Sequence, residues 1–127
     1  MRYLASHQDD AITRNRVETG ECYLARTTTS VHNIIGTTVI VPPGVGDPVC
    51  EYYYRPGDAH FQQFAVDPNL QNLGIGSALL NVVQSRAQTI GASELALDTS
   101  EHSRQLIAMY TKRNCELISY TDWPDTN

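Results

Sequence analysis

Two glycines in the segment QNLGIG (71–76) are the residues whose type and spacing first indicate chemistry. Gly74 and Gly76 lie directly before an apolar, helix-like run, and the turn contains no Lys or Arg. The first amides of a helix lack partners inside it, and the helix dipole adds positive potential there. Glycine also lets a ligand approach the backbone closely. The spacing therefore predicts that backbone amides of this turn bind an anion.

The turn itself has two simple interpretations, a dinucleotide-binding site and a purely structural turn. A strand, Gly-x-Gly, a helix and a second strand ending at Asp98 imitate a dinucleotide-binding fingerprint. Leu79 occupies the place of its third glycine, and Gly74 lies eight positions after Val66 instead of directly after the strand. Both details disfavour that interpretation. Alternatively, the glycines only allow the chain to turn sharply into a helix.

A third interpretation covers the whole segment and its neighbours. QNLGIG matches the Gln/Arg-x-x-Gly-x-Gly/Ala signature of the GNAT N-acetyltransferase superfamily, and FAVDP (64–68) looks like its central strand and turn. LALDTS (95–100) resembles the next strand, and LIAMYTKRNCELI (106–118) resembles the Leu-x-x-x-Tyr-x-x-x-Gly-Phe helix and the strand after it. The resemblance runs over 21–123 and is most specific over 59–110.

The resemblance implies acetyl-coenzyme A (acetyl-CoA) as the cosubstrate, with its pyrophosphate as the anion. The pantetheine arm would lie along the central strand, in a gap where the next strand diverges. The implied cofactor-binding residues are Phe64, Ala65, Val66, Gln71, Asn72, Leu73, Gly74, Ile75, Gly76, Ser77 and Ser103. Ser103 stands where many members have Asn. Asn114-Cys115 replaces their Gly-Phe, and Asn tolerates the same left-handed backbone.

The implied reaction is direct attack of a primary amine, from a small molecule or peptide, on the thioester. By resemblance Tyr110 is the acid for the departing thiolate, and the Val66 amide is a candidate donor to the carbonyl oxygen. From the pattern alone, Tyr110 beside Leu106 and Met109 also fits a core residue of an amphipathic helix. The alternative function is a trimmed domain that binds acyl-CoA or a partner without turnover.

The sequence does not identify the general base. Period-2 alternation places His60, Gln62, Phe64 and Val66 on one face of the central strand. His60 could take a proton through water, or simply face solvent. The tyrosines of EYYYRP (51–56) could line the acceptor pocket or pack within a loop.

The elements that position these residues follow from hydrophobic period and turn residues. We expect an α/β fold with a mixed sheet, GNAT-like and truncated at both ends. It forms one domain over 1–127, with a polar N-terminal helix remnant over 1–20 and a cofactor-binding core over 59–123. The expected strands are 21–27 and 34–43, which form a hairpin, then 59–66, 93–99 and 115–123, and the later helices are 75–90 and 100–114.

The implied missing last strand leaves a gap in the sheet. In the family it runs between the strands that correspond to 94–99 and 115–123. Either these two strands pair directly in parallel, or a second chain inserts a strand and gives a homodimer. We favour the homodimer, because Leu117, Ile118 and Tyr120 would otherwise be poorly covered.

Composition excludes several classes of partner. Nine Lys and Arg against 14 Asp and Glu give a net charge of −5, which argues against nucleic-acid binding. No apolar run approaches the ~20 residues that span a bilayer, and the first ten residues lack a signal-peptide core. We therefore expect a cytoplasmic protein without a membrane partner. Three cysteines and four histidines show no ligand-like spacing, so we expect free thiols and no metal.

Overall fold

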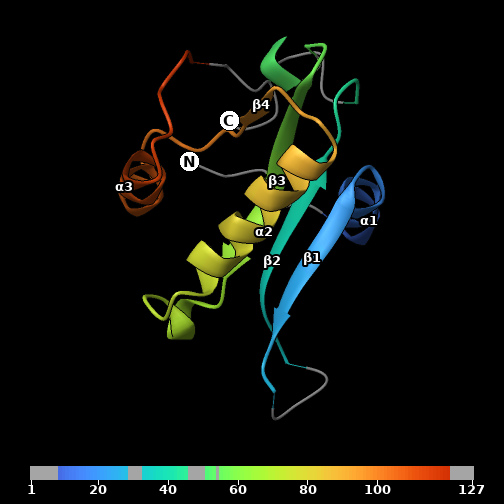
Figure 1. Cartoon of the computed structure of the whole chain (residues 1–127). Coiled ribbons are helices and arrows are strands. Elements are labelled where there is room, and N and C mark those ends of the chain that lie inside the picture. Colours follow the sequence, from blue (N-terminus) through green and yellow to red (C-terminus); the bar gives the residue numbers. More distant parts are fainter. Residues whose placement is uncertain (1–8, 29–32, 46–50, 54, 121–127) are drawn as a thin grey trace.

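The computed structural model describes residues 9–28, 33–45, 51–53 and 55–120. Within them, a four-stranded mixed sheet has the order β1-β2-β3-β4 and α-helices lie around it (Figure 1). The strands are β1 (Glu21–Arg26), β2 (Ile34–Val41), β3 (Asp58–Val66) and β4 (Glu94–Ala96). The helices are α1 (Asp10–Glu18), α2 (Ile75–Thr89) and α3 (Arg104–Lys112), with short 3-10 turns η2 (Glu51–Tyr53) and η3 (Pro68–Leu70). The predicted α/β class with a mixed sheet is confirmed.

Helix α2 lies across one face of the sheet and covers the core (Figure 1). Its buried residues include Leu80, Val83 and Ala87, which pack in one cluster with Ile40 of β2 and Phe61 of β3. These positions repeat at the helical period, which is why the sequence pattern predicted a helix here. Burial of these apolar side chains is what holds α2 on the sheet.

The predicted hairpin and the predicted first helix are also confirmed. Strands β1 and β2 pair in antiparallel register, from Glu21 opposite Ile40 to Ala25 opposite Gly36. The Asp9 carboxylate accepts the Ile12 amide at 2.9 Å and so caps the start of α1, as its residue type favours. No residue of α1 is buried.

Strand β3 contains a bulge that the sequence pattern did not indicate. Thr37 lies opposite Ala65 and Val39 opposite Gln62, so two residues of β3 oppose one residue of β2. Gln63 has a left-handed backbone, with φ of 53°. The Thr37 hydroxyl donates to the Gln63 carbonyl at 2.8 Å. Such an extra residue shifts the side chains beyond it to the opposite face of the strand.

The bulge corrects the predicted faces of β3. Phe64 packs with Phe61, their ring centroids 6.1 Å apart, against the core under α2. Val66 lies on the same face as Phe64, whereas His60 and Gln62 point to the other face. There the Gln62 side-chain amide donates to a backbone carbonyl of α1 at 3.4 Å. The prediction that His60 and Gln62 share a face with Phe64 and Val66 is therefore wrong.

Strands β3 and β4 pair in parallel over a short distance only. Their register joins Asp58 with Glu94, Ala59 with Leu95 and His60 with Ala96. The strand predicted over 93–99 is shorter than expected, because β4 ends at Ala96. The backbone of β3 beyond His60 no longer pairs with β4. The two strands thus stop pairing after His60 and Ala96, which agrees with the divergence that the resemblance implied.

The strand predicted over 115–123 is not formed over Cys115–Tyr120, and the rest of that range lies outside the described residues. Within the described part of the chain, β4 pairs with β3 alone, so its predicted parallel pairing with this segment is absent. A strand needs a partner edge for its amides and carbonyls, and an apolar pattern does not supply one. Leu117, Ile118 and Tyr120 are consequently 75%, 61% and 76% exposed.

The described residues contain neither a membrane-spanning helix nor a cluster of metal-ligating side chains. None of their helices combines the length and apolar character needed to cross a bilayer. Among those same residues, no three His, Cys, Asp or Glu side chains lie together as a metal site would require. Cys22 and Cys115 are free thiols, and Cys50 lies outside the described residues.

Candidate active site

The start of α2 has unpaired amides, as the glycine spacing predicted. Gly74 precedes the helix with φ of 84°, and no side chain caps the helix there. The first amide of the helix that donates inside it belongs to Ala78, which bonds the Gly74 carbonyl at 3.0 Å. The amides of Ile75, Gly76 and Ser77 therefore have no partner within the helix. This end of α2 has the geometry of an anion-binding helix start.

The turn before α2 is open to solvent. Gln71, Asn72 and Leu73 are exposed, and Asn72 has φ of 63°. Apart from its chain neighbours, no heavy atom of the described residues lies within 4 Å of the place where a Gly74 Cβ would be. A ligand can therefore reach the backbone here without displacing a side chain.

Gly76 has a packing role that the sequence did not reveal. A Cβ at this residue would lie 3.3 Å from the Phe64 ring of β3 and 3.7 Å from the Met109 sulfur of α3. It would also lie 3.7 Å from Val66 Cγ2. The missing side chain thus lets α2, β3 and α3 meet at one point, which brings the turn next to the end of β3.

The backbone of β3 beyond the bulge is available on the side that β4 has left. The Asp67 amide donates to Ile35 of β2 at 2.8 Å. Because successive amides of a strand point in opposite directions, the amides of Phe64 and Val66 point away from β2. Ala65 between them is exposed. An extended ligand could pair with this edge as an added strand does.

Tyr110 of α3 lies beside this edge. Its ring centroid is 6.1 Å from that of Phe61 and 6.3 Å from that of Phe64, and the residue is 7% exposed. Burial, followed by the nearby charges of Cys115 and Asp98, raises the pKa of Tyr110 to about 12. The phenol therefore keeps its proton at neutral pH. Tyr110 is both a member of the core cluster and a proton-bearing group close to the β3 edge.

His60 is buried, which makes the solvent-facing alternative wrong. It is 2% exposed, and its ring stacks on Tyr53 with centroids 3.8 Å apart and planes 7° from parallel. Its Nδ1 atom has no hydrogen-bond partner among the residues described. Burial lowers the pKa of His60 to about 4, so the ring is neutral near pH 7. It points to the face of the sheet opposite Phe61 and Tyr110.

The tyrosines of EYYYRP have different environments. Tyr53 is 3% exposed, and its hydroxyl donates to the Asp98 carboxylate. Tyr52 lies under the guanidinium of Arg55, 4.7 Å from the ring centroid, and Tyr54 lies outside the described residues. The sequence indicated a tyrosine-rich wall here but not the partnership between Tyr53 and Asp98. That partnership joins residues 45 positions apart, and no local pattern marks it.

Helix α3 begins after Ser103 without a side-chain cap and ends at a left-handed Asn, as that residue type favours. Ser103 is the residue before α3, and its side chain makes no capping hydrogen bond, so its hydroxyl is not engaged by the helix. Asn114 follows the helix with φ of 65°, the left-handed conformation expected of Asn in place of Gly. The two positions thus preserve the helix ends of the resembled motif despite the changes of residue type.

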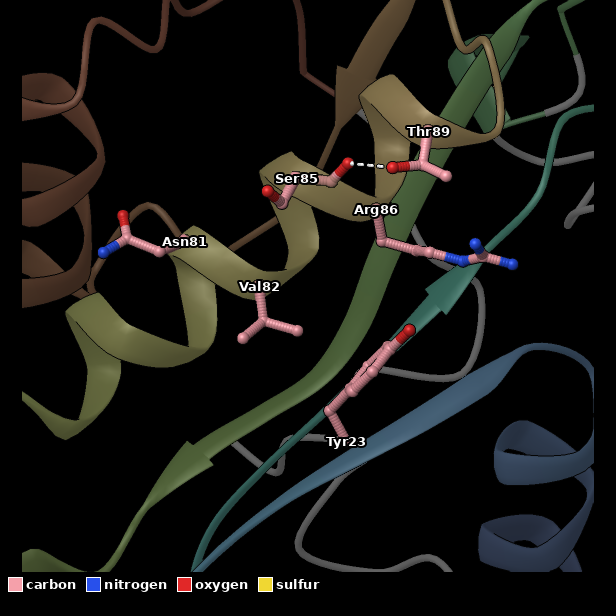
Figure 2. A pocket seen from close by; sticks show the side chains of 6 residues that line it. All are labelled: Tyr23, Asn81, Val82, Ser85, Arg86 and Thr89. Carbon is pink, nitrogen blue, oxygen red and sulfur yellow. Dashed lines mark hydrogen bonds between the residues drawn. The ribbon is translucent and has the colours of Figure 1, made fainter.

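A shallow groove of about 430 Å³ lies elsewhere, between α2 and β1 (Figure 2). Its lining residues are Tyr23, Asn81, Val82, Ser85, Arg86 and Thr89. Arg86 pairs with Glu21 at 2.8 Å, and Glu21 also accepts the Tyr23 hydroxyl. The groove contains none of the predicted site residues, and its charged groups already satisfy one another. The candidate active site is therefore the region around β3 and the start of α2, and not this groove.

Comparison with known proteins identifies the class. Residues 2–115 match the family model described as the acetyltransferase (GNAT) family. The chain therefore belongs to the GNAT acetyltransferase family, which confirms the resemblance seen in its motifs. None of the curated proteins matches the chain in sequence.

Solved structures of acetyltransferases share this fold. The IAA acetyltransferase from Bacillus cereus ATCC 14579 is 27% identical with a TM-score of 0.66, over 83% of this chain and 61% of that protein. A GNAT family acetyltransferase from Elizabethkingia anophelis, solved with acetyl-CoA bound, is 25% identical with a TM-score of 0.64, over 83% and 60%. A Trypanosoma brucei acetyltransferase, 20% identical with a TM-score of 0.68 over 91% and 75%, supports the fold alone. This chain spans about three fifths of the length of the first two.

Proposed function

We propose that this chain is an N-acetyltransferase that moves an acetyl group from acetyl-CoA to a primary amine of a small molecule or peptide. The observation that carries the proposal is that three features of an acetyl-CoA site meet along β3. This strand parts from β4 after His60, and the uncapped start of α2 and the buried Tyr110 both lie beside the unpaired edge. The bound acetyl-CoA of the Elizabethkingia anophelis relative supports the choice of cosubstrate.

The described residues fit this cosubstrate. The pyrophosphate would bind the amides of Leu73–Ser77, where the open space around Gly74 allows close approach. The pantetheine arm would pair with the outward amides of Phe64 and Val66. Gln71, Asn72 and Ser103 would contribute polar side chains at the two ends of this path. Because the turn has no Lys or Arg, amides and the helix dipole would supply most of the attraction for the phosphates.

The residues near the β3 edge match the needs of thioester aminolysis. A free amine attacks the carbonyl carbon, the C–N bond forms, and the C–S bond breaks. The Val66 amide would donate to the carbonyl oxygen as negative charge develops on it. Tyr110 would donate its proton to the departing thiolate, and the high pKa of the phenol ensures that this proton is present at neutral pH.

Ligand-dependent thermal stability, followed by turnover, tests this function. Acetyl-CoA and CoA should raise the melting temperature, whereas NAD should not. A panel of primary amines with a free-thiol readout should then give CoA release that depends on the amine. Stabilisation by NAD without stabilisation by CoA would replace this proposal with the dinucleotide-binding interpretation.

A second function keeps the cosubstrate and omits turnover. The exposed Leu117, Ile118 and Tyr120 and the outer edge of β4, which lacks a partner among the described residues, suit an acyl-CoA-binding or interaction module. The same surface supports a homodimer. Binding of acetyl-CoA without CoA release for any amine would favour this second function.

A further inference from the structure

The buried Tyr53 and the exposed Asp98 are hydrogen-bonded to each other near the point where β3 and β4 diverge. The Tyr53 side chain is almost fully buried, yet its hydroxyl reaches out to an exposed carboxylate. Tyr53 belongs to η2, which lies beside the beginning of β3 (Figure 1), and its ring is held by the stack on His60. A donor fixed in this way orients one carboxylate oxygen and leaves the other oxygen to face a ligand.

The location of Asp98 is specific to the divergence of the strands. Ala96 is the last residue of β4 that pairs with β3, opposite His60, and Asp98 follows it by two positions. Tyr53 and His60 lie on the face of the sheet opposite α2, whereas Tyr110 contacts Phe61 on the α2 face. Asp98 accepts the hydrogen bond of Tyr53, and its charge also helps to raise the pKa of Tyr110. It therefore lies near both Tyr53 and the proposed acid Tyr110, just beyond the last residue pair that joins β4 to β3.

We propose that Asp98 is the carboxylate that receives the acceptor nitrogen and takes its proton, that Tyr53 is its positioning residue, and that the acceptor is an alkylamine that is cationic at neutral pH. This inference rests on the proposed acetyl transfer and assigns the base that the sequence left open. A carboxylate attracts an ammonium ion and discriminates against uncharged aryl amines.

The proton steps balance in this arrangement. The ammonium gives one proton to Asp98, which is exposed and can pass it to water. The free amine attacks the thioester carbon, and the nitrogen becomes positive as the C–N bond forms. Asp98 stabilises that charge and takes the second proton, while the sulfur leaves with the proton of Tyr110. The proton on Asp98 then returns to the Tyr110 phenolate, so the net products are the amide, CoA thiol and one proton.

Substitution of the pair tests the inference on the full chain. Asp98→Asn keeps an acceptor for the Tyr53 hydroxyl and removes the charge, so kcat/KM for hexylamine should fall ~10²-fold or more, as expected for a lost base. The Kd for acetyl-CoA should stay within about 2-fold, since the phosphate site is untouched. The preference for hexylamine over aniline should shrink as well. Glu101→Gln, which removes a nearby exposed charge, is the matched control and should change neither value.

Tyr53→Phe tests the positioning role, because it keeps the stack on His60 and removes only the hydroxyl. It should lower kcat/KM for hexylamine by roughly 10–100-fold, the size expected for one hydrogen bond to a charged group. A merely structural role would lower the melting temperature without changing the pH profile of kcat/KM. We expect the opposite pattern.

Binding of hexylammonium to the CoA complex, measured by NMR titration, separates this inference from the function on which it rests. Turnover that Asp98→Asn leaves unchanged overturns the inference and leaves the transferase function standing. Amine binding that requires Asp98 without any turnover overturns the transferase function and keeps the amine site. Absence of both turnover and amine binding in the unmodified protein overturns both.

Discussion

Tyr110 is the residue on which the proposed chemistry depends most directly. Tyr110→Phe keeps the ring against Phe61 and Phe64 and removes only the proton donor. We expect kcat to fall ~10²-fold or more while the Kd for acetyl-CoA changes little, as measured by steady-state kinetics and calorimetry. An unchanged kcat would assign Tyr110 to the core alone, in agreement with its burial.

His60 makes the stability of the fold sensitive to acid. Its pKa is lowered to about 4 in the folded protein and is about 6.5 when unfolded. Between these values the unfolded state binds the proton, so the contribution of His60 is complete above pH 6.5 and decreases as the pH falls toward 4. The free energy of unfolding should drop by about 2 kcal/mol from this source between pH 7.5 and 5.

Urea unfolding of His60→Phe measures this contribution. Phe keeps an aromatic ring for the stack on Tyr53 and cannot take a proton, so its stability should decline less between the two pH values. The carboxylates titrate equally in both proteins and cancel in the comparison. Equal pH dependence of the two proteins would show that His60 is not the acid-sensitive group.

At the scale of elements, the two ends of α2 supply a matched pair of glycines. Gly74 and Gly91 both have positive φ, and among the described residues no heavy atom beyond their chain neighbours lies within 4 Å of either Cβ position. Gly74→Val and Gly91→Val should each cost about 1–2 kcal/mol of stability from backbone strain. Only Gly74→Val should weaken acetyl-CoA binding, by ~10-fold or more, because only its side chain meets the phosphates. Isothermal titration calorimetry decides the point, and equal Kd values in both variants would contradict the proposed phosphate site.

The elements also show why the sequence predicted some features and missed others. The period of α2 and the hairpin of β1 and β2 depend on local residue patterns, so they were predictable. The bulge is a single left-handed residue, Gln63, whose type gives no signal, yet it moves Phe64 and His60 to opposite faces. The pairing of Tyr53 with Asp98 depends on distant residues meeting, and period and spacing carry no information about that.

At the scale of the whole molecule, exposed apolar residues after α3 favour association. Leu117, Ile118 and Tyr120 present a large apolar surface next to a sheet whose β4 edge has no partner within the described residues. We expect a homodimer at micromolar concentration by light scattering, and Leu117→Asp should convert it to a monomer. Ile12→Asp, at a similarly apolar but separate exposed site on α1, is the control. A monomer in the unmodified protein would contradict this assembly.

Because few residue pairs join β3 and β4, the part of the molecule after α2 is held to the sheet less firmly than β1, β2 and α2 are held together. Three residue pairs join β4 to the sheet, whereas β1 and β2 pair along most of their length with α2 packed over β2 and β3. Opening of those few hydrogen bonds, together with release of Tyr110 from its aromatic neighbours and of Arg113 from Asn81 and Gln84 of α2, would free β4 and α3 while the hairpin and α2 stay folded. We expect the segment that carries Tyr110, the proposed proton donor, to open as a separate unit, and a cosubstrate that bridges α2 and α3 would merge the two parts into one.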